Sequence, residues 1–170
     1  MSAYPQSPIL ITSARHRREV ALEGVPERES IHSLSVRASA AFSVSPSRLF
    51  YALTIPEYVE TWFTPPDADD IRCTGNPPEE ALSIDLHHNR RATASIFAEY
   101  KRISAQDFSV RWYFRSRSRT HVSHLRIAIR TVRANALLRI RHSGFTDPSD
   151  WIWHQELWGL SLTKMQMVIR

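Results

Sequence analysis

The sequence predicts an α+β domain in which an antiparallel sheet wraps around a long C-terminal helix. Segments with alternating apolar and polar residues occupy much of the chain between residues 33 and 142. After them, apolar residues recur at spacings of 3, 4, 4, 3 and 4, which is the period of one buried helix face. The residues in that row are Trp151, His154, Trp158, Leu162, Met165 and Ile169.

Length and composition favour one soluble domain. The chain has 170 residues, of which 42% are hydrophobic and 23% are charged, and no apolar run approaches a membrane span. We expect residues 1–30 to be a partly disordered N-terminal extension, with Ile9–Ile11 as a short apolar patch that could dock on the domain, and residues 31–170 to be the folded part. Met1–Pro5 lacks the features of a secretory signal, and Cys73 has no partner for an intrachain disulfide, so we expect a cytoplasmic protein.

Two short helices are predicted after the first strand, which we place at 33–44. Ser45 and Pro46 provide a hydroxyl N-cap and a proline at the first helical position. Pro56 begins a second short helix in which Val59, Trp62 and Phe63 can share a face.

Six further strands are predicted at 69–74, 81–87, 93–103, 107–115, 121–131 and 136–142. In the fourth and fifth of these, apolar residues alternate mainly with arginine, as expected for an antiparallel sheet with one buried face. The outer face should therefore carry Arg111, Arg115, Arg126, Arg130, Arg139 and Arg141.

Two segments carry a resemblance to a known family. One is Val44–Glu57, with its Ala-Leu-Thr-Ile-Pro-Glu stretch, together with Trp62; the other is His142-Ser143-Gly144-Phe145 with the helical row from Trp158 to Ile169. Over residues 33–169 the chain resembles the START-like (SRPBCC) superfamily, in the branch named after the C-terminal domain of the activator of Hsp90 ATPase. The resemblance implies the helix-grip fold, a curved antiparallel sheet around a long C-terminal helix.

The chain also departs from that family pattern. Members often have a glycine-rich second strand and a Gly-x-Tyr in the fourth strand, whereas the corresponding regions here are Ile71-Arg72-Cys73-Thr74-Gly75 and Ala98-Glu99-Tyr100. No segment corresponds to the separate N-terminal Hsp90-binding domain of the namesake co-chaperone, so we do not expect direct binding of Hsp90.

The resemblance implies that a small hydrophobic or amphipathic molecule binds in a cavity between the sheet and the C-terminal helix. Apolar walls with a few polar groups are typical of such pockets, although the same side chains could simply fill a core. The candidate lining residues are Trp62, Phe63, Tyr100, Trp112, Phe114, Ile127, Ile129, Leu138, Ile140, His142, His154, Trp158, Leu162 and Met165.

His142 is the sharpest single candidate in this set. It follows Leu138 and Ile140 in phase and should point inward, either to contact a ligand or to fasten the strand end to the helix. An alternative function is that of a cyclase or dehydratase-like enzyme, in which His142, Tyr100 and His154 would be the acid–base groups. We expect no metal site, because no close set of three or four ligands is visible and His121 and His124 should lie on opposite faces of a strand. We also expect no cofactor.

Two outer surfaces are candidates for contact with a partner molecule or with another part of this chain. The arginine face could serve a protein or a nucleic acid, but Tyr113 is the main aromatic residue there for stacking on bases, so we expect a solvated face and no nucleic-acid partner. On the C-terminal helix, Trp153, Leu160 and Met167 should form an exposed apolar row, covered by a second copy in a homodimer or by Ile9–Ile11.

Overall fold

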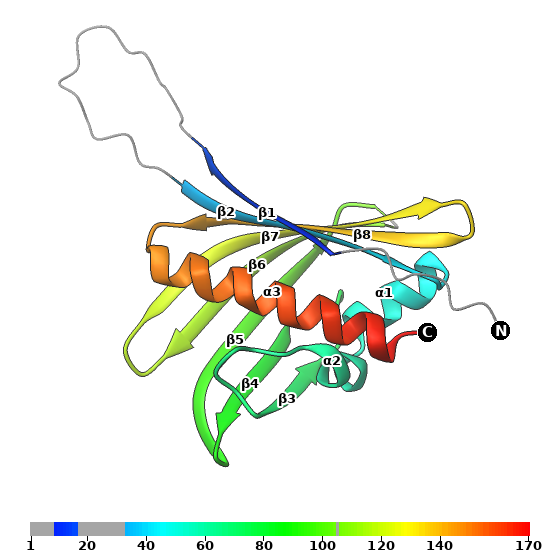
Figure 1. Cartoon of the computed structure of the whole chain (residues 1–170). Coiled ribbons are helices and arrows are strands. Elements are labelled where there is room, and N and C mark those ends of the chain that lie inside the picture. The colour runs from blue at the N-terminus through cyan, green and yellow to red at the C-terminus, as the bar shows by residue number, and fades with distance from the viewer. Residues whose placement is uncertain (1–8, 17–32, 105) are drawn as a thin grey trace, which may run out of the picture.

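The computed structural model describes residues 9–16, 33–104 and 106–170. Within these residues the sheet has eight strands in the order β1-β2-β8-β7-β6-β5-β4-β3, and each neighbouring pair is antiparallel. Figure 1 shows the sheet bending around α3, the predicted helix-grip arrangement. The elements are β1 (Leu10–His16), β2 (Ser33–Phe42), α1 (Pro46–Thr54), α2 (Pro56–Trp62), β3 (Asp70–Gly75), β4 (Leu82–His88), β5 (Arg91–Arg102), β6 (Asp107–Ser116), β7 (Thr120–Val132), β8 (Asn135–Phe145) and α3 (Pro148–Val168).

The short helices begin where the sequence predicts. The Ser45 side chain accepts a hydrogen bond from the Arg48 backbone N–H at 3.3 Å, and a proline occupies the first turn of both helices. The Trp62 indole donates to the Ala52 carbonyl at 2.8 Å and so ties α2 to α1. Asp147 caps α3 by accepting from the Ser149 N–H at 2.7 Å.

Strand β1 lies inside the predicted N-terminal extension and was not expected as a strand. It pairs with β2 from Leu10 opposite Ser39 to His16 opposite Ser33, so it forms one edge of the sheet. The rest of the predicted extension, residues 1–8 and 17–32, lies outside the described residues.

The buried face of α3 is wider than one row. His154, Trp158, Leu162 and Met165 are buried as predicted, and a second row beside them contains Trp153, Leu157 and Ser161. The expected exposure of Trp153 is therefore wrong. Its ring lies 5.1 Å from that of Phe114, and its indole donates to the Asp67 carboxylate at 3.0 Å. A sheet that curves around the helix covers more of its circumference than a flat sheet would.

The other two members of the predicted exposed row do lie at the surface, since Leu160 is 41% exposed and Met167 is 58% exposed. A contact with a second copy at these residues stays a prediction. Among the described helices, none is both long enough and apolar enough to cross a membrane.

The two leucines on α3 provide a matched test of the helix orientation. Leu162→Ala removes a side chain that is fully buried against the sheet, so we expect it to lower the free energy of unfolding by about 2–5 kcal/mol. Leu160→Ala, at an exposed position two residues earlier, should change it by about 0.5 kcal/mol or less. Urea unfolding of both variants measures this. Equal losses would contradict the observed rotation of α3.

Candidate functional site

The residues predicted to line a cavity meet in a packed layer between the sheet and α3. The Trp112 ring lies 5.3 Å from the His142 ring and 6.0 Å from the Trp158 ring, and Phe63 closes the layer 6.1 Å from Trp112. All of the predicted lining residues except the half-buried Tyr100 are at most 5% exposed. The layer is the core of the domain, and ligand contact at these positions stays a prediction.

Tyr100 lies at the edge of this layer. Its hydroxyl donates to the Leu53 carbonyl at 3.4 Å, a long hydrogen bond. Burial, with a smaller contribution from Cys73, raises the pKa of Tyr100, so the phenol stays protonated at neutral pH.

His142 is held by hydrogen bonds at both ring nitrogens. Its Nδ1 lies 3.1 Å from the Trp158 Nε1, and its Nε2 lies 2.8 Å from the Ser123 hydroxyl. Because an indole N–H can only donate, Nδ1 must be the acceptor, and the neutral ring then donates from Nε2 to Ser123. Burial lowers the pKa of His142 well below 6.5, and repulsion from His154 adds to the effect. These contacts are those of a histidine that fastens the strand end to the helix.

His121 and His154 complete a buried histidine cluster with His142. The His154 ring centroid lies 4.7 Å from that of His142 and 5.2 Å from that of His121. His154 Nδ1 donates to the Asp150 carbonyl at 2.7 Å, whereas its Nε2 has no hydrogen-bond partner in the described part of the chain. Burial lowers the pKa of His154 to about 3.

His121 faces the side chain of Asp150 at one end of this cluster. Its Nδ1 lies 3.2 Å from Asp150 Oδ2, and Arg119 Nη1 lies 2.8 Å from Asp150 Oδ1. Burial lowers the pKa of His121 although Asp150 opposes the shift. The described residues contain no group of three or more histidine, cysteine or acidic side chains arranged to hold a metal ion.

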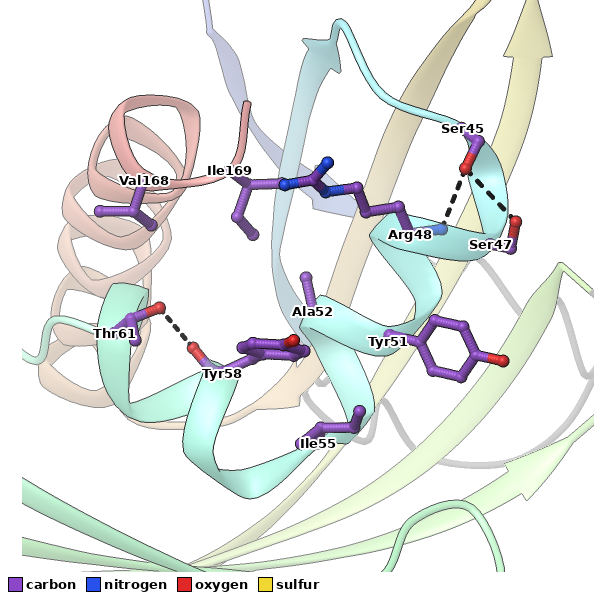
Figure 2. A pocket seen from close by; sticks show the side chains of 10 residues that line it. All are labelled: Ser45, Ser47, Arg48, Tyr51, Ala52, Ile55, Tyr58, Thr61, Val168 and Ile169. Carbon is purple, nitrogen blue, oxygen red and sulfur yellow. Dashed lines mark hydrogen bonds between the residues drawn. The ribbon is translucent and has the colours of Figure 1, made fainter.

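A hollow of about 770 Å³ opens elsewhere, between α1, α2 and the C-terminal end of α3 (Figure 2). We call it the α1–α2–α3 pocket. Its apolar surface comes from Ala52, Ile55, Val168 and Ile169. The other lining residues are Ser45, Ser47, Arg48, Tyr51, Tyr58 and Thr61.

The bend before Pro56 shapes this hollow. Ile55 ends α1 and precedes Pro56, and its extended backbone, with φ −84° and ψ 120°, is the conformation that a following proline favours. The chain therefore bends between two short helices, and the end of α3 faces the bend (Figure 1).

One cation faces the apolar surface of the pocket. Figure 2 shows the Arg48 side chain reaching from α1 toward Ile169 across the hollow. Arg48 forms no ion pair with any residue that the structure describes. Tyr51 and Tyr58 are 53% and 51% exposed, an unusual aromatic surface for two short neighbouring helices.

The histidine cluster predicts an acid-sensitive fold. Above about pH 7 these rings are neutral in both the folded and the unfolded protein, so they add no pH dependence. Below their ordinary pKa of 6.5 the unfolded chain takes up protons, whereas buried His142 and His154 stay neutral. We therefore expect the free energy of unfolding to fall by about 1.4 kcal/mol per pH unit for each such histidine.

Urea unfolding between about pH 8 and pH 5 measures this slope. His154→Leu should make the slope shallower, because one titrating group is lost, whereas Leu160→Ala, which removes no titratable group from an exposed position on α3, should leave it unchanged. A wild-type stability that is constant over this range would contradict the burial of neutral histidines.

Comparisons with known proteins bear on the fold. No family model matches the sequence, and no relative was found among curated proteins. The fold is similar to the crystal structure of CalU16 from Micromonospora echinospora, with a TM-score of 0.63 and 13% identity over 96% of this chain and 87% of that chain. It is also similar to CV1439 from Chromobacterium violaceum, with a TM-score of 0.65 and 14% identity over 79% of this chain and 96% of that chain.

A third similar structure is the AHSA1 protein SPO3351 from Silicibacter pomeroyi. Its TM-score is 0.62, with 16% identity over 78% of this chain and 95% of that chain. The identities are low, so the likeness concerns the fold. Together with the sheet order and the long α3, these comparisons show that the chain has the START-like helix-grip fold.

Proposed function

We propose that this protein binds a small amphipathic molecule in the α1–α2–α3 pocket, with the acidic or hydrogen-bond-accepting end of the ligand toward Arg48. The observation that carries the proposal is the opposition of the Arg48 guanidinium, which has no ion-pair partner among the described residues, to the apolar surface of Ile55 and Ile169. A guanidinium binds carboxylate, sulfonate or phosphate oxygens well, and the apolar surface offers burial for a hydrocarbon or aromatic body.

The size of the pocket supports a small ligand. Pockets for drug-sized molecules usually enclose about 300–1,000 Å³, and this one measures about 770 Å³. The position differs from the sequence-based expectation of a cavity between sheet and helix, where the side chains pack against one another.

The arrangement of the titratable groups favours binding over the cyclase or dehydratase alternative. His142 uses both of its ring nitrogens in buried hydrogen bonds, and His154 is fully buried. In the part of the chain that the structure describes, the pocket is lined by no histidine, aspartate or glutamate. A general acid or base needs to reach the reacting group of a substrate, and these residues do not.

Two fluorescent probes test the proposal. The sulfonated probe 8-anilinonaphthalene-1-sulfonate has an apolar body and an anionic group, and N-phenyl-1-naphthylamine has the same kind of body without the charge. We expect both to bind. Arg48→Met should weaken binding of the sulfonated probe by about two- to fivefold and leave the neutral probe unaffected, because the variant removes only the charge partner.

A second pair of variants locates the bound probe. Thr61 and Thr163 are both exposed threonines whose hydroxyls donate to a carbonyl of the preceding helical turn, at 2.7 Å and 2.8 Å. Thr61→Trp adds a large side chain at the pocket and should abolish binding of both probes. Thr163→Trp adds the same bulk on α3 outside the pocket and should preserve it. Equal probe affinities for the two tryptophan variants would overturn the proposed position.

A further inference from the structure

The outer face of the sheet places arginines side by side. Arg37 on β2 lies directly opposite Arg141 on β8, which lies opposite Arg126 on β7, and all three are exposed. Directly opposed side chains have Cβ atoms about 4.5–5.5 Å apart, and like charges in such pairs destabilise a sheet. The row therefore places three positive charges where they repel one another.

The adjoining row contains small residues. Ser39 on β2 lies opposite Arg139 on β8, which lies opposite Ala128 on β7. Because the side chains of Ser39 and Ala128 are small, the surface is recessed on either side of Arg139. A hollow of about 580 Å³ forms there, and Arg130 and Asp107 also line it.

Among the residues that the structure describes, most of this positive charge has no ion-pair partner. Arg130 Nη2 lies 2.7 Å from Asp107 Oδ1, and this hydrogen bond is the main cause that lowers the pKa of Asp107. The other arginines of the hollow form no ion pair with any residue in the described ranges: Arg37, Arg126, Arg139 and Arg141.

A carboxylate elsewhere on the same face is already engaged. Glu99 on β5 accepts a hydrogen bond from the Tyr113 hydroxyl at 3.1 Å, and its Oε2 also lies 3.9 Å from Arg111 Nη1. Glu99 therefore interacts with Arg111 and Tyr113 on β6 rather than with the arginines of the hollow.

We propose that this hollow binds a compact polyphosphate. Guanidinium groups match phosphate oxygens as planar forks, and several of them converge here on one concave surface. They extend across three neighbouring strands, a span of about 10 Å, which suits several linked phosphates better than a single anion. None of the described residues that line the hollow is aromatic, so they offer no stacking surface for bases, and a short anion fits the hollow better than a nucleic-acid strand.

This site is separate from the proposed ligand pocket. The arginine hollow lies on the outer face of β2, β8 and β7, whereas the α1–α2–α3 pocket lies among the helices on the side that the sheet encloses (Figure 1). The inference therefore does not depend on the proposed function.

Titration with inorganic triphosphate in a calorimeter at low ionic strength tests the assignment. We expect saturable binding with one site per chain and a higher thermal unfolding temperature in the presence of triphosphate. Arg141→Gln removes the central charge of the row and should weaken binding by about tenfold or more. Without ligand, the same variant should unfold at the wild-type temperature or slightly above it, because repulsion from Arg37 and Arg126 is relieved.

Two controls separate a site from general positive charge. Arg115→Gln removes an exposed arginine from the same face outside the hollow, and it should change the triphosphate affinity by about twofold or less. Thr61→Trp should leave triphosphate binding unchanged, since it alters only the other pocket.

Three results would overturn the assignment. One is the absence of saturable triphosphate binding by the wild-type chain. Another is equal weakening by Arg115→Gln and Arg141→Gln, which would indicate diffuse attraction. The third is tighter binding of a short single-stranded oligothymidylate than of triphosphate, which would indicate a nucleic-acid surface instead.

Discussion

A buried hydrogen-bonded chain from Trp158 through His142 to Ser123 joins α3 to β8 and β8 to β7. All three side chains are at most 2% exposed, so the loss of any one member would leave another without a partner away from water, at a cost of about 1–3 kcal/mol for each stranded group. Apolar contacts tolerate some sliding and rotation, whereas a hydrogen bond requires a particular direction. These hydrogen bonds therefore set the rotation of α3 over the sheet, and this rotation determines which rows of the helix are buried.

With the helix in that orientation, large rings fill the space that the sheet encloses. Trp112, Phe114 and Phe145 pack around the histidine cluster, and this burial keeps His142 and His154 neutral. Two further contacts hold the C-terminal half of α3. The Thr64 backbone N–H donates to the Ser161 hydroxyl at 2.9 Å, and the Gln166 amide donates to the Ala41 carbonyl at 3.1 Å. The α1–α2–α3 pocket lies beyond this layer, where α3 ends beside the bend between the two short helices.

The two faces of the sheet have opposite chemistry for the same geometric reason. Alternation along β7 and β8 directs Leu125, Ile127 and Ile140 inward and arginines outward. Water screens the outward charges, so the fold tolerates Arg37, Arg141 and Arg126 in one cross-strand row. On the buried inner face, charges are not screened in this way. The histidines there must therefore form hydrogen bonds or remain neutral.

Much of the fold could be predicted from local patterns. A strand's alternation and a helix cap depend on residues close in sequence, and so the order of β2 to α3 and the start of α1 at Pro46 are confirmed. Strand β1 was missed because its pairing uses the open edge of β2 and its sequence has no clear alternation. The periodicity of α3 indicates one buried row, whereas the curved sheet covers two, and for this reason Trp153 is buried and not exposed.

The candidate pocket could not be predicted from the sequence. Its lining combines residues 45–61 with Val168 and Ile169, more than a hundred residues away, and only the tertiary structure brings those segments together. The sequence also identified the inward residues of the sheet and helix but could not decide between a cavity and a core, because that depends on how closely the rings fit. By itself the sequence determined the element order, the inward and outward faces and the inward position of His142. The tertiary structure decided where space remains, because packing is a property of side chains that meet only after folding.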